Sequence, residues 1–442
     1  MEKRKVKWTG VALIFLMVVV TFSGCVGQEE EGKETVTTTR FETVTTTEVK
    51  LETKLPEVIK IGVVLPLTGA LGAYGPDMVR GAQIAAHVIN RDGGIMGSMI
   101  ELIVEDSETT PEGSVESATK LVEIDKVQAI IGAAGSSNTL GIARGVTIDS
   151  NVILISPAST SPELTGVDDD NTLWRTAGPD RFQGMAMADL ADYMDWTTTA
   201  IMTLDNSYGI GLANAFEDVW DGEVLTRIEY DPAVLAWQTE LTAIDAMDPD
   251  FLWLCCYQED GSEVMRELKE LAIDIPVMSA DGFGDPTVVT DNDVASRVVN
   301  PPTIGTMPYT PESPGKVHFH ALWAEAHVSE ASMAEWGLHP GGAAVGSTEP
   351  GIYAREAYDA MNLIALAIAY SGEYTADAIK EWFPYVSTIY KPASGDKTFD
   401  EFGDVAQDYA VYRFTGEGTV ATTEFETIGS WNAITGLSIT SA

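Results

Sequence analysis

The chain has 442 residues, 45% of them apolar, which is enough for two domains with ordinary hydrophobic cores. Its formal net charge of −41 at pH 7 repels phosphate backbones, which argues against nucleic acid as a partner. With three cysteines in the whole sequence, a disulfide framework is excluded as the basis of the fold.

Residues 1–24 have the pattern of a secretory signal, with four basic residues followed by an apolar run from Val11 to Phe22. That run is shorter than the roughly 20 residues that a membrane-spanning helix needs. Small residues then precede Cys25, and this arrangement resembles a lipoprotein signal. The resemblance implies that Cys25 is lipidated and anchors the protein to the outer face of the cell membrane. The alternative is an uncleaved signal anchor, and both place the body outside the cytoplasm.

Residues 25–56 are predicted to form a disordered tether. From Val26 to Pro56 the chain has nine threonines, charged residues and few large apolar side chains. Such a composition cannot bury a core and stays solvated.

From Val58 onward, short apolar runs alternate with segments of helical periodicity. The buried strands are predicted at Ile59–Leu67, Ile100–Val104, Ala129–Ile131 and Val152–Ile155. A Gly-rich loop, Thr68–Pro76, follows the first strand, and the next helix ends at Gly93 and Gly94. This alternation is typical of a parallel sheet that is covered by helices on both faces.

The pattern breaks near residues 168–179 and then restarts as a second α/β unit. Its strands are predicted at Thr199–Leu204, Val224–Tyr230, Phe251–Cys256 and Pro276–Ala280. Its helices are predicted at Gln183–Met194, Leu212–Trp220, Trp237–Ala246 and Ser262–Leu271. Two further helices, Val317–Val328 and Tyr353–Tyr370, precede short strands such as Tyr409–Phe414.

The simplest assembly returns the chain to complete the first lobe and then the second. We therefore predict one lobe from residues 57–178 plus 306–388 and another from residues 179–305 plus 389–442. About three crossovers join them and act as a hinge.

Two turns of small and hydroxyl-bearing residues follow neighbouring strands, Gly132–Asn138 and Ser156–Thr160. A helix that starts at such a turn leaves backbone N–H groups that hold an anion, most plausibly a carboxylate. Parallel connectivity brings strand ends to one edge of a sheet, so Ser136 and Thr160 should face a shared crevice. We predict that this crevice binds the ligand.

Several segments together resemble the type I periplasmic binding proteins, in the branch of Leu/Ile/Val-binding proteins of ABC importers. They are Ile61–Gly69, Tyr74-Gly75, Ile89–Gly97, Ser156–Thr165 and Tyr208-Gly209. The resemblance spans nearly all of Val58–Phe414. It implies an α/β Venus flytrap of two doubly wound Rossmann-like lobes joined by a three-segment hinge, which holds one amino acid between the lobes.

The resemblance also implies which residues bind the ligand. The family's ligand-binding positions match Tyr74, Ser136, Ala158, Thr160, Tyr208, Tyr257 and Asp281. The hydroxyls of Ser136 and Thr160 would hold the carboxylate, and Asp281, where the family usually has Glu, would hold the ammonium. A zwitterion needs donors at one end and a fixed negative charge at the other. The alternatives are that the serines are helix caps, that Asp281 is a turn residue and that the tyrosines are ordinary packing.

By the same resemblance, the protein is a monomeric solute-binding lipoprotein that delivers an amino acid to an ABC permease in the membrane. A ligand-sensing receptor subunit for amino acids or amides, built on the same fold, is the alternative. A secreted hydrolase is a third hypothesis. No catalytic motif supports it, so we predict no enzyme activity and no cofactor.

Three other features of the sequence could carry chemistry. Gly209–Asn214 has the first two glycines of a dinucleotide fingerprint, but Asn214 replaces the third. His318, His320 and His327 could suggest a metal, yet the first two point apart on a helix, so we predict no metal site. The adjacent Cys255 and Cys256 are either two buried thiols or a strained vicinal disulfide.

Overall fold

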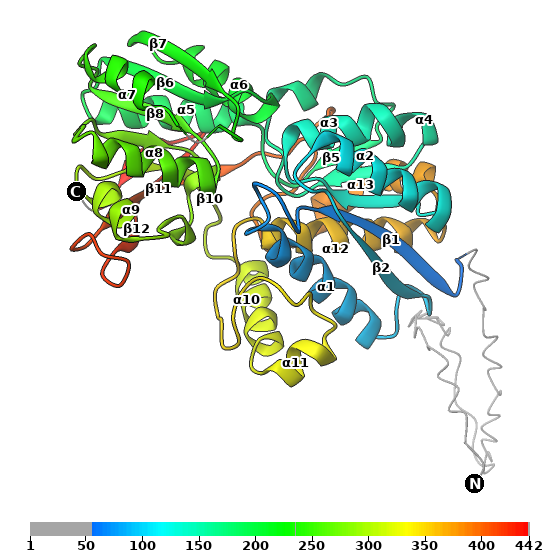
Figure 1. Cartoon of the computed structure of the whole chain (residues 1–442). Coiled ribbons are helices and arrows are strands. Elements are labelled where there is room, and N and C mark those ends of the chain that lie inside the picture. Colours follow the sequence, from blue (N-terminus) through cyan, green and yellow to red (C-terminus); the bar gives the residue numbers. More distant parts are fainter. Residues whose placement is uncertain (1–54, 235, 441–442) are drawn as a thin grey trace, which may run out of the picture. The chain divides into compact units, whose positions relative to one another are not determined.

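The computed structural model describes residues 55–234 and 236–440 (Figure 1). The predicted signal peptide, Cys25 and nearly all of the predicted tether lie outside these residues. Within the described ranges, no helix combines the length and the apolar character that crossing a membrane requires.

The first sheet has five strands, and all of its pairings are parallel. They are β1 (Val58–Leu65), β2 (Met99–Asp106), β3 (Ala129–Gly132), β4 (Ile153–Ser156) and β5 (Leu173–Arg175), in the order β2-β1-β3-β4-β5. Every residue of β3 and β4 is buried, which explains why these strands are continuous apolar runs.

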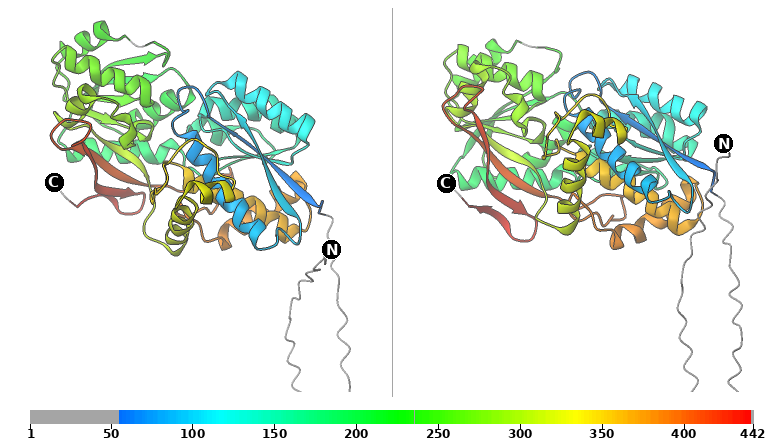
Figure 2. Two further views of the ribbon diagram at one scale, coloured as in Figure 1. Left: turned by 60° about the horizontal axis from the view of Figure 1, so that its bottom comes forward. Right: turned by 90° about the horizontal axis from the view of Figure 1, so that it is seen from below.

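Helices cover both faces of the first sheet, and together they form lobe 1. They are α1 (Gly75–Arg91), α2 (Pro111–Lys120), α3 (Ser136–Ile142), α4 (Ile148–Ser150), α10 (Pro314–Ala326), α11 (Glu330–Glu335), α12 (Ala354–Ser371) and α13 (Ala376–Ile389). Helices α1 and α12 lie side by side, although more than 260 residues separate their starts (Figures 1 and 2). Apolar residues repeat along α12 at helical spacing, and most of that helix is buried.

The second sheet has eight strands and mixes parallel with antiparallel pairings. They are β6 (Thr198–Leu204), β7 (Glu223–Tyr230), β8 (Phe251–Cys255), β9 (Val277–Ser279), β10 (Ile304–Tyr309), β11 (Asp408–Thr415), β12 (Glu424–Asn432) and β13 (Gly436–Ile439). Their order is β13-β12-β11-β10-β9-β8-β6-β7, and the three C-terminal strands pair antiparallel. With α5 (Asp180–Tyr193), α6 (Ser207–Glu217), α7 (Gln238–Asp245), α8 (Gln258–Glu270) and α9 (Asn292–Val299), this sheet forms lobe 2.

The chain passes between the two sheets three times, after β5, after β10 and after α13. The predicted α/β fold with two lobes and three connections is confirmed. The boundary that we expected between residues 305 and 306 falls inside β10, which pairs with β9 and β11 of the second sheet. The exact division of the chain into lobes stays a prediction.

Candidate functional site

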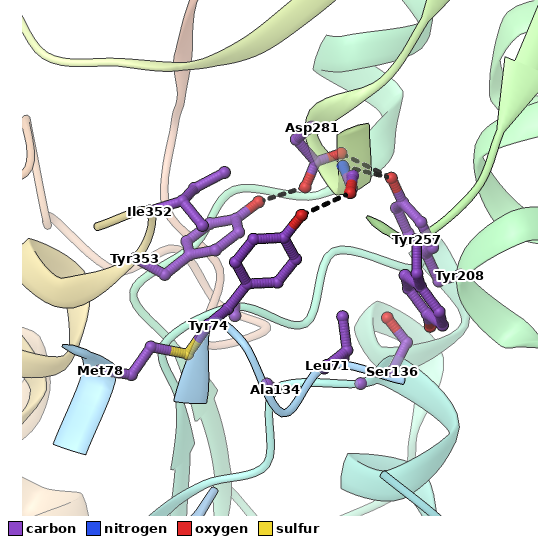
Figure 3. A pocket seen from close by; sticks show the side chains of 13 residues that line it. Leu71, Tyr74, Met78, Ala134, Ser136, Tyr208, Tyr257, Asp281, Ile352 and Tyr353 are labelled. Carbon is purple, nitrogen blue, oxygen red and sulfur yellow. Dashed lines mark hydrogen bonds between the residues drawn. The ribbon is translucent and has the colours of Figure 1, made fainter. Parts of the chain in front are cut away.

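A cavity is lined mainly by segments that follow the C-terminal ends of strands in both sheets (Figure 3). Six of the seven predicted ligand-binding residues line it: Tyr74, Ser136, Ala158, Tyr208, Tyr257 and Asp281. Small-molecule sites usually combine apolar walls with a few convergent polar groups, and this cavity has both.

One wall of the cavity carries a buried carboxylate. Asp281 opens a short 3-10 helix directly after β9, and its side chain is only 5% exposed. Its Oδ1 accepts a hydrogen bond of 2.7 Å from the Tyr208 hydroxyl, and its Oδ2 accepts one of 2.5 Å from the Tyr353 hydroxyl (Figure 3). Two phenol donors from different lobes therefore fix the orientation of this negative charge.

The two tyrosines keep their protons over the physiological range. Burial, and then the nearby charge of Asp281, raise the pKa of both the Tyr208 and the Tyr353 hydroxyl well above the ordinary value. Tyr208 also accepts a hydrogen bond of 3.2 Å from the backbone N–H of Gly282. The carboxylate and its donors thus form one connected network that joins Asp281 and Tyr208 of lobe 2 to Tyr353 of lobe 1.

The facing wall carries the Ser136 hydroxyl. Strand β3 ends at Gly132, and α3 begins at Ser136, which is 2% exposed. Its Oγ accepts hydrogen bonds of 3.2 Å from the backbone N–H groups of Thr160 and Ser161. Because these bonds use the oxygen as acceptor, the hydroxyl hydrogen is left to act as a donor. Ser136 therefore joins the two predicted turns, and its side chain does not cap α3.

Thr160 is the seventh predicted residue, and it does not line the cavity. It lies behind Ser136, where its carbonyl oxygen accepts a 2.7 Å hydrogen bond from the N–H of Asp180. The Asp180 carboxyl at the start of α5 is fully buried. Burial and the charge of Asp281 raise its pKa well above the usual range, an effect that the neighbouring Thr160 hydroxyl opposes.

Aromatic side chains form the rest of the polar lining. The hydroxyl of Tyr74, which precedes α1, donates a 3.2 Å hydrogen bond to the carbonyl of Gly282 in lobe 2. Tyr257 stacks on Tyr208 with ring centroids 5.8 Å apart. Asp260 accepts a hydrogen bond from the Tyr257 N–H, and burial raises the pKa of Asp260 to about 7. These contacts hold the rings in fixed orientations.

Sequence reasoning missed four further side chains that line the cavity: Leu71, Met78, Ile352 and Tyr353. Leu71 and Met78 lie close to Tyr74 in the sequence, so their apolar side chains beside a predicted site residue could have identified them as part of the lining. Tyr353 has a left-handed backbone, with φ of 62°, immediately before α12. No motif marks it, because its position depends on how the chain returns to lobe 1.

Other candidate groups have structural partners. His327 Nε2 lies 3.0 Å from Arg80 Nη1, and His320 Nε2 lies 3.3 Å from Arg355 Nη1, so these rings face cations. Across the described part of the chain, no group of three or more His, Cys, Asp or Glu is placed to hold a metal ion. Cys255 and Cys256 are two free, buried thiols.

Residues 58–419 match the family model described as periplasmic binding protein. The Leu/Ile/Val-binding protein BraC3 of Rhizobium johnstonii is 30% identical over 232 residues, 51% of this chain and 62% of that relative, so the match spans less than two thirds of its length. An amino acid binding protein of Pseudomonas aeruginosa is 29% identical over 81% of this chain and 91% of its own. Both relatives are named as binding proteins.

Two solved structures share the fold. The leucine binding protein LivK of Thermotoga maritima superposes with a TM-score of 0.72 at 24% identity, covering 85% of this chain and 99% of its own. The branched-chain amino acid transporter substrate binding protein LivJ of Streptococcus pneumoniae, in complex with isoleucine, has a TM-score of 0.68 at 24% identity, covering 84% of this chain and 99% of its own. The predicted type I fold is thereby confirmed. The chain belongs to the periplasmic binding protein family.

Proposed function

We propose that this protein captures one small apolar amino acid, branched-chain or similar, between its two lobes and delivers it to an ABC permease. The observation that carries the proposal is the placement of a carboxylate on one side of the cavity and a hydroxyl donor on the other. Asp281, held by two tyrosine hydroxyls, lies on the lobe 2 side, and the Ser136 hydroxyl lies on the lobe 1 side. The relatives named for Leu/Ile/Val and amino acids support this ligand class.

The ligand would lie with its ammonium group against Asp281 and its carboxylate against Ser136. Its side chain would then contact Leu71, Met78 and Ile352, which offer apolar surface. Hydrogen bonds to charged groups contribute roughly 1.5–3 kcal/mol each. Because the two polar groups belong to different lobes, both act fully only when the lobes approach, so the ligand selects the closed state.

The proposal also includes a lipid anchor in the membrane and a monomeric body. Lipidation at Cys25 would hold the protein at the outer face of the membrane, with residues 25–56 as the tether and the body as a monomer. A periplasmic binding protein works outside the cytoplasm, which agrees with the signal pattern of residues 1–24.

A thermal-shift screen across amino acids and related amides tests this ligand class. A ligand at 100 times its dissociation constant adds about 2.7 kcal/mol to the free energy of unfolding. We expect the melting temperature to rise with leucine, isoleucine or valine. Stabilisation by amides or aromatic acids alone would contradict the proposal. Aromatic acids belong in the screen because a solute binding protein of Rhodopseudomonas palustris with this fold was solved with benzoate.

We predict that the double variant Ser136→Ala, Thr160→Val weakens amino-acid binding about tenfold. It removes the donor that Ser136 offers to the cavity, together with the hydroxyl of Thr160, whose backbone N–H bonds to Ser136 from behind. Calorimetric titration measures the change. Ser114→Ala is the control, because that serine is also fully buried in lobe 1 but bonds to the Thr110 carbonyl away from the cavity. If the double variant binds as tightly as the control, the carboxylate lies elsewhere.

A second candidate function is that of a sensor subunit, and one relative favours it. The chemotactic signal transduction system substrate-binding protein BasB of Halobacterium salinarum is 27% identical over 73% of this chain and 72% of its own. Cellular uptake of labelled amino acid separates the two functions. Deleting the gene should abolish uptake if the protein serves an importer, and should leave uptake unchanged if it serves only a receptor.

A further inference from the structure

The first turn of α6 is a point where the two lobes touch beside the cavity. Helix α6 belongs to lobe 2, and the Asn206 side chain caps it by accepting a hydrogen bond from the Gly209 N–H. The backbone N–H of Ser207 in this turn donates a 3.0 Å hydrogen bond to the Ser137 hydroxyl of lobe 1. This bond uses a free N–H of the helix start, which otherwise needs water or a side chain as partner.

Gly211, one turn into α6, has lobe 1 packed directly against it. A Cβ atom built on Gly211 would lie 2.8 Å from Ser161 Oγ and 2.9 Å from Pro162 Cδ. Non-bonded carbon atoms are normally about 3.5–4.0 Å apart, so a methyl group does not fit while the lobes are in contact. Ser161 accepts a hydrogen bond from the Glu163 N–H, and Pro162 has a fixed ring, so neither moves aside freely.

Helix conformation does not explain why residue 211 is glycine. Gly211 lies inside α6 and lacks the positive φ that favours glycine elsewhere in the chain. In a helix interior glycine is roughly 1 kcal/mol less favourable than alanine. Gly209 differs, because its Cβ would collide with the Leu204 carbonyl of its own lobe. The contact between the lobes therefore explains why residue 211, the second glycine of the Gly209–Asn214 segment, is glycine.

The contact is linked to the cavity through neighbouring residues. Ser137 directly follows Ser136, and Ser161 directly follows the turn that carries Ala158. Tyr208 lies between Ser207 and Gly211 in α6. We propose that Gly211, with the Ser137–Ser207 bond, is the docking contact that permits the lobes to close on the ligand. This inference rests on the proposed function, since closure on an amino acid is its premise.

Gly211→Ala separates closure from folding. The substitution favours α6 itself, so the ligand-free protein should stay folded and unfold in one cooperative thermal transition, as the wild type does. Closure brings the new methyl group against Ser161 and Pro162, so we expect L-isoleucine to bind at least fivefold more weakly in calorimetric titrations. Gly166→Ala is the matched control, because a Cβ there meets no atom within 4 Å and its φ is not positive. It should bind as the wild type does.

A second readout needs no ligand. Amide hydrogen exchange of the full chain should show faster exchange at Ser207 in Gly211→Ala and in Ser137→Ala than in the wild type or Gly166→Ala. Unchanged exchange at Ser207 in Gly211→Ala would overturn the docking contact. Equal L-isoleucine affinity of Gly211→Ala and wild type would do the same. A wild type that binds no amino acid would instead refute the proposed function, and the exchange result would still decide the contact.

Discussion

Replacing Asp281 by asparagine is expected to weaken amino-acid binding about 10- to 150-fold, which corresponds to roughly 1.5–3 kcal/mol. The variant keeps the shape of the side chain and removes its charge. In the proposed complex this charge faces the ligand's ammonium group inside a cavity, where water screens it little. The bonds from Tyr208 and Tyr353 fix both carboxylate oxygens, so little reorganisation accompanies binding.

Calorimetric titration of Asp281→Asn with isoleucine measures this loss. Asp285→Asn provides the control, because the same change four residues along affects a carboxylate that caps a neighbouring turn and does not line the cavity. Tyr353→Phe should give a smaller loss, since it removes one donor to the carboxylate and keeps the charge. Affinity of Asp281→Asn within twofold of the Asp285→Asn control would remove Asp281 from the site.

Replacing Arg175 by methionine is expected to lower the free energy of unfolding by about 3–5 kcal/mol. Arg175 ends β5, and its Nε lies 2.5 Å from Asp404 Oδ1, in the connection between α13 and β11. The two side chains are 2% and 3% exposed. Removing the arginine leaves a buried carboxylate whose remaining cation is the half-exposed Arg181, at 3.4 Å.

Urea unfolding of the ligand-free protein measures this change. Arg144→Met is the matched control, because Arg144 pairs with Glu163 at 2.9 Å on the surface and should contribute less than about 1 kcal/mol. The double variant Arg175→Met, Asp404→Leu should recover part of the loss, since it leaves no unpaired charge. Equal effects of Arg175→Met and Arg144→Met would show that the buried pair does not stabilise the contact between the end of β5 and the connection from α13 to β11.

The fold could be predicted where burial dictates the sequence pattern. Strands predicted at Ala129–Ile131 and Val152–Ile155 are β3 and β4 within one residue at each end, because a strand buried on both faces must be apolar throughout. Strand β10 was missed, since Gly305 and Pro308 disfavour a strand although it lies inside the sheet. Strands β12 and β13 alternate weakly, and most of their residues are only partly buried.

The site could be predicted where neighbouring parallel strands end. Ser136 and Ala158 follow β3 and β4, which pair directly, so their arrival at one cavity follows from topology. Thr160 was expected at the same surface, but the turn directs it behind Ser136 toward Asp180. Tyr353 reaches Asp281 from a segment 72 positions along the chain, and no local pattern encodes such a contact.

A crystal structure of the protein with L-isoleucine bound tests the central claim most directly. We predict that the ligand's ammonium group lies within hydrogen-bond distance of the Asp281 carboxylate and that its carboxylate accepts a hydrogen bond from Ser136 Oγ. The aliphatic side chain should contact Leu71, Met78 and Ile352. Isoleucine held at another place, or held in this cavity with Asp281 bonded to the tyrosines alone, would contradict the account.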